Sequence, residues 1–374
     1  MEQAPLKIGI VCYPTIGGSG VVATEIATHA AQRGHHVHLL SYDRPTRLSR
    51  DNNSVNYHNV RVSAYPLLRY PPYALSLATR MLEVQEEFDL DVFHVHYAIP
   101  HAVSAFLARS MSGGRLRCIT TLHGTDITVV GADKSYARPT RFAIEQSNAV
   151  TAVSQFLADE TKTRFAVEKN IEVIPNFVDT DKYSPGSGGR YYERSEEERV
   201  IVHTSNFRPI KRVADVMRAF SIIHKQIPAR LILVGDGPDR EHAMAIAADT
   251  GCLDQVEHLG NLESTETVLA DADLFLLASE TESFGLSMLE AMSCGVPCVS
   301  THVGGVHEVL GETGALTAPG NPGHLAEEAL KFLTDEKKHA EASVAARNRA
   351  TDLFNLETGI RRYEDLYRRV IESD

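Results

Sequence analysis

Two glutamates in the segment ESFGLSMLE, Glu282 and Glu290, have the type and spacing to bind a sugar nucleotide. The segment follows an apolar run at 273–279, and Gly285 marks the expected start of a helix capped by Ser283 or a neighbour. Backbone N–H groups at a helix start bind phosphate or hydroxyl oxygens. Glu290, inside the helix, can accept both hydroxyls of a ribose, and Glu282 can bind sugar hydroxyls and stabilise positive charge at an anomeric carbon. An amphipathic surface helix would explain Glu290, but not a glycine turn and an acid together at the end of a strand.

A second group of candidates lies in SNFRPIKR, directly after the apolar run at 200–204. Arg208, Lys211 and Arg212 supply cations there. Glycosyl transfer from a nucleotide diphosphate needs such cations, because negative charge builds on the leaving oxygen as the bond breaks. A solvated basic start to a helix would have the same composition, so this motif alone leaves both interpretations open.

The glycine turn near the N-terminus fits two kinds of ligand. Gly18, Gly20 and Ala23 match the spacing of a dinucleotide fingerprint, and Asp43 stands twenty residues beyond Ala23. This pattern favours an NAD-dependent dehydrogenase. A glycine turn that opens a helix also suits a carboxylate or a sugar diphosphate, so the turn does not decide between them.

Four histidines gather at the expected ends of two strands: His94, His96, His101 and His123. His94 and His96 are two residues apart on a strand and therefore share a face, which suggests a metal site. No acidic residue stands at metal-site spacing, so we prefer hydrogen-bonded histidines and expect no metal. His123 suits a hydrogen-bonding role at the carboxyl end of its strand, where open α/β sheets bind ligands.

These residues must be positioned by two Rossmann-like domains of α/β class. Short apolar runs alternate with helix-length stretches in both halves, which is typical of doubly wound parallel sheets. A segment at 183–199, rich in glycine, serine and charge, reads as a linker. We therefore predict an N-terminal acceptor-side domain at 1–183, a C-terminal nucleotide-sugar domain at 184–355, and a helix at 356–374. The strands are expected at 7–13, 36–42, 91–97, 118–124, 149–153, 200–204, 230–235, 256–260, 273–279 and 297–301.

The composition excludes several classes of protein. The 374 residues include 37 basic and 49 acidic side chains, a formal net charge of −12, which argues against a nucleic-acid surface. The apolar runs are too short to span a bilayer, and the N-terminus lacks a charged-then-apolar leader, so we expect a soluble, cytoplasmic protein without membrane binding. The five cysteines are an odd number scattered through a long chain, which argues against a disulfide framework.

Taken together, six motifs resemble glycosyltransferase family 4, in the family's order and over nearly the whole chain: GGSG, HGTD, IPNFVD, SNFRPIKR, VGDGP and ESFGLSMLEAM. The resemblance implies the GT-B fold, with two Rossmann-like domains whose parallel sheets face a central cleft. It also implies that the helix at 356–374 packs back on the N-terminal domain. CYPTIGGSGVVATE, RYPPYALSLA and HVHYAIPHAVSAFLA further resemble the members of this family that start bacillithiol synthesis. That resemblance implies UDP-N-acetylglucosamine as donor and L-malate as acceptor.

The resemblance also implies roles for individual residues. Glu282, His123, Lys211 and Arg208 are expected to take part in catalysis. On the donor side we expect Gly18, Asn206, Arg208, Lys211, Phe284, Gly285, Leu286 and Glu290. On the acceptor side we expect Ser19, Tyr97, Thr121 and His123. Ser205 and Asn206 stand where many family members have Gly-Arg, so the usual diphosphate arginine is absent and Arg208 is its expected substitute.

The expected reaction is a front-face displacement that retains the anomeric configuration and needs no protein nucleophile, cofactor or obligatory divalent ion. Within the family, an inositol phosphate, a sugar or a lipid could replace malate as acceptor. Outside it, the rivals are an NAD-dependent dehydrogenase and a sugar-nucleotide-binding protein without activity. Assembly into a homo-oligomer stays open.

Overall fold

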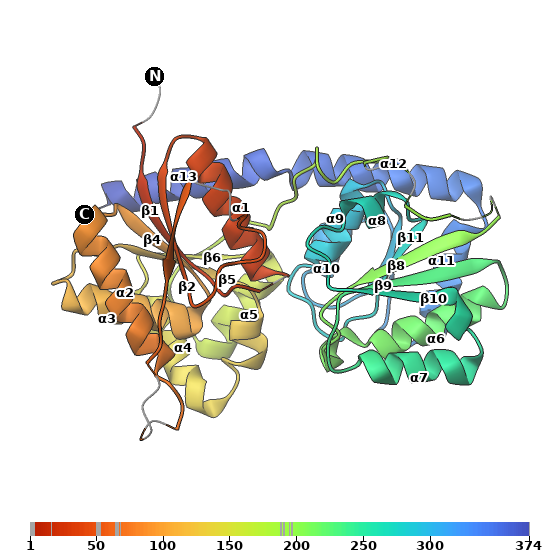
Figure 1. Cartoon of the computed structure of the whole chain (residues 1–374), viewed down its shortest axis with the longest axis horizontal. Helices are drawn as coiled ribbons and strands as arrows, with labels where there is room; N and C mark the ends of the chain where they lie inside the picture. The colour runs from red at the N-terminus through yellow and green to blue at the C-terminus, as the bar shows by residue number, and fades with distance from the viewer. Residues whose placement is uncertain are drawn as a thin grey trace. The chain divides into compact units, whose positions relative to one another are not determined.

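The computed structural model describes residues 4–15, 17–49, 54–63, 67, 69–187, 189, 191–193, 195 and 197–373. By its internal contacts the chain divides into two units. The first unit comprises Met1–Pro175 and Glu357–Asp374, and the second comprises Asn176–Leu356. Each unit contains one parallel sheet flanked by helices (Figure 1). The prediction of two doubly wound α/β domains is confirmed.

The first unit is built on seven parallel strands in the order β3-β2-β1-β4-β5-β6-β7. Ile8 on β1 pairs with Val37 on β2 and with Val92 on β4. The strands are β1 (Lys7–Val11), β2 (His36–Ser41), β3 (Val55–Asn59), β4 (Val92–His96), β5 (Cys118–Leu122), β6 (Ala149–Ala152) and β7 (Ile171–Val173). The helices are α1 (Ser19–Gln32), α2 (Tyr73–Phe88), η1 (Ala98–Ala102), α3 (Val103–Met111), η2 (Thr125–Val129), α4 (Lys134–Gln146), α5 (Gln155–Phe165) and α13 (Leu356–Glu372).

The second unit is built on six parallel strands in the order β10-β9-β8-β11-β12-β13. Ile201 on β8 pairs with Leu231 on β9 and with Leu274 on β11, and all three are fully buried. The strands are β8 (Arg199–Thr204), β9 (Ala229–Val234), β10 (Val256–Gly260), β11 (Leu274–Leu277), β12 (Cys298–Thr301) and β13 (Ala315–Thr317). The helices are η3 (Pro209–Lys211), α6 (Val213–His224), α7 (Arg240–Thr250), η4 (Leu253–Gln255), α8 (Glu266–Ala270), α9 (Leu286–Ser293), α10 (Val306–Leu310), α11 (Pro322–Leu333) and α12 (Glu336–Leu353).

The strand order of each sheet reverses at one place, and that place determines where a ligand can bind. In the first sheet the reversal lies between β1 and β4, and in the second it lies between β8 and β11. Ligands of open α/β sheets bind outside the carboxyl ends of the strands at such a switch point. The loops that leave β1, β4, β8 and β11 are therefore the positions to search for a site.

Three strands that the sequence pattern did not predict, β3, β7 and β13, all lie at the edge of a sheet. An edge strand is covered on fewer sides, so it needs no continuous apolar run. β3 reads VNYHN, and β7 and β13 have only three residues each. Apolar runs in the sequence therefore predict the buried central strands better than they predict these three edge strands.

The expected linker at 183–199 packs against the second unit. Tyr183 and Tyr192 are buried, and the carbonyl oxygen of Tyr183 accepts hydrogen bonds from Ser293 Oγ at 2.6 Å and Arg347 Nη1 at 2.8 Å. The contacts place the division between the units at Pro175, earlier than the predicted boundary at 183. Four residues of the expected linker, at 188, 190, 194 and 196, lie outside the described residues.

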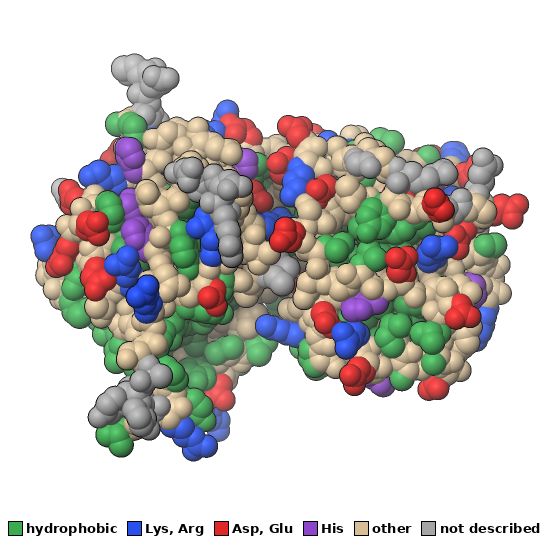
Figure 2. All heavy atoms as spheres, viewed as in Figure 1, with side chains coloured by type: hydrophobic (Ala, Val, Ile, Leu, Met, Phe, Trp, Pro, Cys, Tyr) green, Lys and Arg blue, Asp and Glu red, His purple; other side chains and the backbone are tan. Residues whose placement is uncertain are grey.

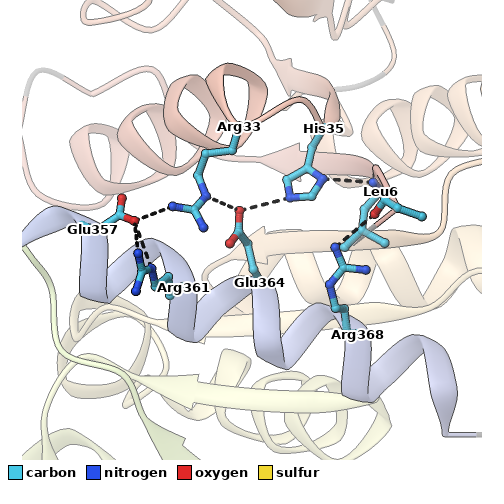
Figure 3. Close-up of polar contacts among 8 residues, drawn as sticks. Leu6, Arg33, His35, Glu357, Arg361, Glu364 and Arg368 are labelled. Atoms are coloured by element: carbon cyan, nitrogen blue, oxygen red, sulfur yellow. Dashed lines mark hydrogen bonds and ion pairs between the residues drawn. The ribbon is translucent and has the colours of Figure 1, made fainter. Parts of the chain in front are cut away.

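Helix α13 belongs to the first unit although the whole second unit precedes it in the chain. Its buried face carries Ile360, Tyr363, Tyr367 and Val370 at helical spacing, and Tyr367 Oη lies 2.8 Å from His94 Nδ1 on β4. A polar cluster centred on the buried Glu364 joins α13 to the segment between α1 and β2. There, Glu364 Oε1 accepts hydrogen bonds from Arg33 Nε at 2.8 Å and His35 Nε2 at 3.1 Å (Figure 3).

None of the helices formed by the described residues is both long and apolar enough to cross a membrane. On the face drawn in Figure 2, basic side chains are interspersed with acidic ones. With a net charge of −12, an anionic ligand needs cations placed close to it.

Replacing Glu364 by glutamine should weaken the attachment of α13. Although burial opposes it, hydrogen bonds from His35 and Arg33 lower the pKa of Glu364 below its ordinary value of 4.5. The carboxylate therefore stabilises the fold fully above about pH 4.5, and this contribution is lost as the pH falls through the lowered pKa. We expect Glu364→Gln to cost about 1–3 kcal/mol at pH 7 and much less near pH 3.

Thermal unfolding of both proteins at the two pH values measures this difference. The matched control is Glu83→Gln, which removes an exposed ion pair with Arg80 on α2 and should change stability by less than about 0.5 kcal/mol. An equal loss for Glu364→Gln at both pH values would show that its charge is not responsible.

Candidate active site

The switch point of the first sheet brings together three of the predicted acceptor residues. Gly18 has φ of +60°, a conformation that glycine adopts readily, and α1 begins directly after it. Ser19 Oγ donates a hydrogen bond of 2.8 Å to Tyr97 Oη, which follows β4. The ring of Tyr97 lies 5.3 Å from that of His123, which follows β5. Ser19, Tyr97 and His123 thus share one edge of the sheet, and Tyr97 and His123 are half-buried.

Tyr97 has a backbone conformation that is rare outside glycine, with φ of +91°. Its N–H donates to the carbonyl oxygen of Thr121 at 2.9 Å, so the neighbouring strand holds it in place. Residues kept in such conformations cluster at functional sites, because the surrounding structure must compensate for the strain.

The histidines on β4 and directly after β5 contact other protein groups. His96 Nδ1 lies 2.8 Å from His123 Nε2, and His94 Nε2 lies 2.6 Å from Thr121 Oγ1. Burial lowers the pKa of both His94 and His123 to about 3, so both rings are neutral at neutral pH. Both ring nitrogens of the fully buried His94 are engaged by Tyr367 and Thr121, so only the half-buried His123 of these two can bind a ligand, through a hydrogen bond and not as a cation. Among the residues that the structure describes, no cluster of three or more His, Cys, Asp or Glu side chains is arranged to hold a metal ion.

Thr121, the fourth predicted acceptor residue, uses its hydroxyl inside the fold. It is fully buried, and Oγ1 lies 2.6 Å from both His94 Nε2 and Thr151 Oγ1. The observed contacts connect β4, β5 and β6. A direct contact of Thr121 with an acceptor stays a prediction.

Asp126 is a buried residue whose role the sequence analysis missed. Its Oδ2 accepts from the N–H of Ala98 at 2.9 Å, and its Oδ1 accepts from the N–H of Gly124 at 3.0 Å and of His123 at 3.2 Å. One carboxylate thus fixes the backbone after β4 and after β5. Burial raises the pKa of Asp126 to about 6, although these hydrogen bonds oppose the shift. The aspartate of the HGTD motif, three residues after His123, was the available signal.

Packing around the glycine turn gives a reason for the residues that match the dinucleotide fingerprint, and this reason involves no bound dinucleotide. A Cβ on Gly20 would lie 2.6 Å from the carbonyl oxygen of Thr15, so the start of α1 can approach the preceding loop only with glycine there. Ala23 is fully buried, and Asp43 is exposed beyond β2. Close packing of the start of α1 on the loop after β1 therefore accounts for the glycine at position 20.

The switch point of the second sheet joins a lysine to a glutamate. After β8 the chain turns into η3, which ends at Lys211, and after β11 it runs through Glu282 towards α9. Lys211 Nζ forms an ion pair with a carboxylate oxygen of Glu282, and both side chains are largely buried. The N–H of Glu280 donates to the carbonyl oxygen of Ile210 at 2.7 Å, so the two loops are also linked through their backbones.

The other cations of this segment differ in their surroundings. Arg208 is exposed, and its guanidinium has no hydrogen bond or ion pair with any residue that the structure describes. Arg212 is engaged at the start of α6, where its Nε donates to Asp215 Oδ2 at 2.6 Å. Asn206 is exposed on the same turn. Arg208 is therefore better placed than Arg212 to meet an anion, whereas Lys211 is held by Glu282.

Helix α9 begins at Leu286, with Gly285 as its N-cap residue at φ of +94°. The expectation that Ser283 or a neighbour caps this helix is wrong, because no side chain caps it and the glycine makes the turn through its backbone. The first amides of α9 have no partner within the helix and can bind an anion or hydroxyls. Glu290 lies inside α9 and is only 6% exposed, and Phe284 packs edge-on against Phe354 with ring centroids 5.8 Å apart.

Two family descriptions match the chain, one in each half. Residues 16–182 match Glycosyltransferase Family 4, and residues 191–349 match Glycosyl transferases group 1. N-acetyl-alpha-D-glucosaminyl L-malate synthase of Bacillus anthracis is 44% identical over 374 residues, an alignment that covers 99% of this chain and 98% of that protein.

Solved structures show the same fold at low sequence identity. Sucrose-phosphate synthase from Thermosynechococcus elongatus has a TM-score of 0.83 at 18% identity, with 100% of both chains covered. The Anabaena protein HepE, solved in complex with UDP-glucose, has a TM-score of 0.78 at 20% identity, with 97% of this chain and 100% of that chain covered.

Replacing Asp126 by asparagine should loosen the turns that carry Tyr97 and His123. An amide has one acceptor oxygen where the carboxylate has two, so at least one of the three backbone N–H groups loses its partner, at a cost of about 1–3 kcal/mol. Hydrogen exchange at the amides of Ala98, His123 and Gly124 should become faster.

The pH dependence provides a second readout of the same variant. Because the folded-state pKa of Asp126 is raised from 3.8 to about 6, its neutral form stabilises the fold fully below about pH 3.8, and this contribution is lost as the pH rises from there to about 6. Asparagine cannot ionise, so the stability difference between the two proteins should be larger at pH 5 than at pH 7. The control is Asp133→Asn, at the exposed N-cap of α4, which should leave the three amides unchanged. Unchanged exchange in Asp126→Asn would contradict the assigned role.

Proposed function

The chain belongs to glycosyltransferase family 4, and we propose that it transfers N-acetylglucosamine from UDP-N-acetylglucosamine to the hydroxyl of L-malate with retention of configuration. The ion pair between Lys211 and Glu282 at the switch point of the second sheet carries the proposal, because it places a cation and an acid where a ligand of such a sheet binds. The near full-length similarity to a GlcNAc-malate synthase supports the choice of substrates.

The second unit holds the donor. Lys211 and the exposed Arg208 bind the diphosphate and stabilise the charge that develops on it as the glycosidic bond breaks. The first amides of α9, near Gly285 and Leu286, bind phosphate or sugar oxygens. Glu290 accepts the ribose hydroxyls, and Glu282 accepts hydroxyls of the N-acetylglucosamine.

The first unit holds the acceptor. Ser19 and Tyr97 are already hydrogen-bonded to each other, and together with the start of α1 they offer hydroxyl and amide groups to a carboxylate of malate. His123 is neutral and contributes a hydrogen bond rather than a charge. Malate as a dianion therefore gains its binding energy from oriented dipoles at this edge of the sheet.

The reaction balances without a protein nucleophile. The malate hydroxyl oxygen forms a bond to the anomeric carbon on the face from which UDP departs, as the bond from that carbon to the β-phosphate oxygen breaks. The hydroxyl proton passes to a phosphate oxygen of the departing UDP. Glu282 stabilises the positive charge on the sugar, while Lys211 and Arg208 stabilise the negative charge on the leaving group.

One experiment distinguishes the proposed function from two others that the same residues would allow: transfer to another acceptor, and binding of the sugar nucleotide without turnover. Purified protein is incubated with UDP-N-acetylglucosamine, L-malate and EDTA, and the products are identified by mass spectrometry. We expect GlcNAc-malate and UDP in equal amounts, in the α configuration by NMR. Turnover only with another acceptor would overturn the malate assignment, UDP binding without any turnover would indicate a binding protein, and turnover that needs an added divalent ion would contradict the metal-free mechanism.

Replacing Lys211 by glutamine should lower kcat by about 10²–10³, because the leaving group loses a preorganised cation in a water-poor site. The matched control is Lys225→Gln, at the exposed end of α6, which should leave kcat unchanged. A change confined to KM for malate would contradict the assignment of Lys211 to the donor.

A further inference from the structure

His203 is a fully buried histidine on β8, and it lies directly before the turn that carries the donor cations. Its Nδ1 is 2.8 Å from the carbonyl oxygen of Leu276 on the neighbouring strand β11, and its Nε2 is 2.8 Å from Ser205 Oγ. The ring therefore bridges the two strands on either side of the switch point.

The hydrogen-bond partners determine which nitrogen carries the proton. A carbonyl oxygen only accepts, so Nδ1–H of His203 must donate to Leu276. In the neutral ring Nε2 is then an acceptor, and the hydroxyl of Ser205 donates to it. The same hydroxyl oxygen accepts from the N–H of Phe207 at 3.3 Å. Burial lowers the pKa of His203 to about 4, which is consistent with a neutral ring.

Phe207 shows why this turn needs support. Its φ is +41°, in the left-handed region that non-glycine residues avoid, and its side chain is fully buried. Its ring centroid lies 6.0 Å from that of His203, so the histidine supports Phe207 through packing as well as through Ser205. The carbonyl oxygen of Phe207 accepts from the N–H of Asp239 at 3.0 Å.

The loop after β9, which contains Gly235 and Gly237, packs closely against the same turn. A Cβ on Gly235 would lie 1.8 Å from the carbonyl oxygen of Ser205, and a Cβ on Gly237 would lie 2.1 Å from that of Asn206. Both contacts are with backbone, so only glycine allows this approach. The glycines of VGDGP therefore leave the turn no room to move towards them.

The turn at Ser205–Phe207 is followed directly by Arg208 and Lys211, the cations assigned to the donor diphosphate. Arg208 is the next residue after Phe207, and its carbonyl oxygen accepts from the N–H of Lys211 at 2.8 Å. Lys211 in turn pairs with Glu282. Any rotation of the backbone at Phe207 would displace both cations.

We infer that His203 is a positioning residue for the donor diphosphate, acting through the hydroxyl of Ser205 to hold the turn that presents Arg208 and Lys211. This inference rests on the proposed function, since it assigns that diphosphate to the same turn. Neither His203 nor Ser205 needs to touch the substrate. Serine at position 205 is then required for its hydroxyl, whereas glycine there would leave His203 Nε2 without a donor.

The test compares Ser205→Ala with Ser205→Thr, which keeps a hydroxyl. Loss of one hydrogen bond corresponds to about 3- to 10-fold, so Ser205→Ala should raise KM for UDP-N-acetylglucosamine and weaken UDP binding in calorimetry by that factor. KM for L-malate should change less than about twofold, and Ser205→Thr should restore the donor constants. The control is Ser300→Ala, a buried serine on β12 whose Oγ makes, within the described part of the chain, only a 3.5 Å contact to a carbonyl oxygen.

A double-mutant cycle with His203→Asn, which keeps a donor for Leu276, links the two residues. The effects of Ser205→Ala and His203→Asn on UDP affinity should not add, because each removes the same interaction. Equal affinities for UDP in Ser205→Ala and the wild type, or additive effects, would overturn the inference even if thermal stability falls. If His203→Asn does not fold, the comparison of alanine with threonine at 205 decides. UDP binding needs no acceptor, so failure of the malate assay leaves this test intact.

Discussion

Where a parallel strand ends, the backbone leaves the sheet with donors that the neighbouring strands no longer satisfy, and both units meet this need with a polar side chain from the loop that follows a strand. In the first unit Asp126 accepts from three backbone N–H groups. In the second unit Ser205 accepts from Phe207 and is held by His203. Left unsatisfied, each buried donor would cost about 1–3 kcal/mol. The chemically useful residues, His123 and Lys211, lie on the turns that these contacts fix.

The acidic chain deals with an anionic ligand by placing single cations rather than by its overall field. Its net charge is −12, so the long-range potential repels a nucleotide diphosphate. Lys211 is held by Glu282 in a largely buried position, where the attraction between charges is stronger than in water. Arg208 is exposed and has no charged partner among the described residues. Lys211 is therefore preorganised in a largely buried position, whereas Arg208 is available at the surface to bind the ligand.

The sequence predicted the two parallel sheets, because their central strands are buried on both faces and must be continuous apolar runs. It placed Glu282 in a loop and Glu290 inside a helix, as observed. It did not predict the edge strands or the glycine cap of α9. The role of Asp126 was missed although the HGTD motif was a signal for it, and the role of His203 was out of reach, because it depends on a contact with Leu276 whose distance only the fold determines. Lys211 and Glu282 are 71 residues apart, and no periodicity in the chain connects them.

The position of α13 in the first unit affects how the chain can fold as it is synthesised. His94 on β4 finds its partner Tyr367 only after the whole second unit has left the ribosome. Until then the face of the first sheet that α13 covers exposes apolar surface, which is a site for chaperone binding or for association with another nascent chain. The second unit is continuous in sequence and can complete its core without waiting. The first unit, although its synthesis begins first, therefore lacks one of its packing helices until α13 has been made.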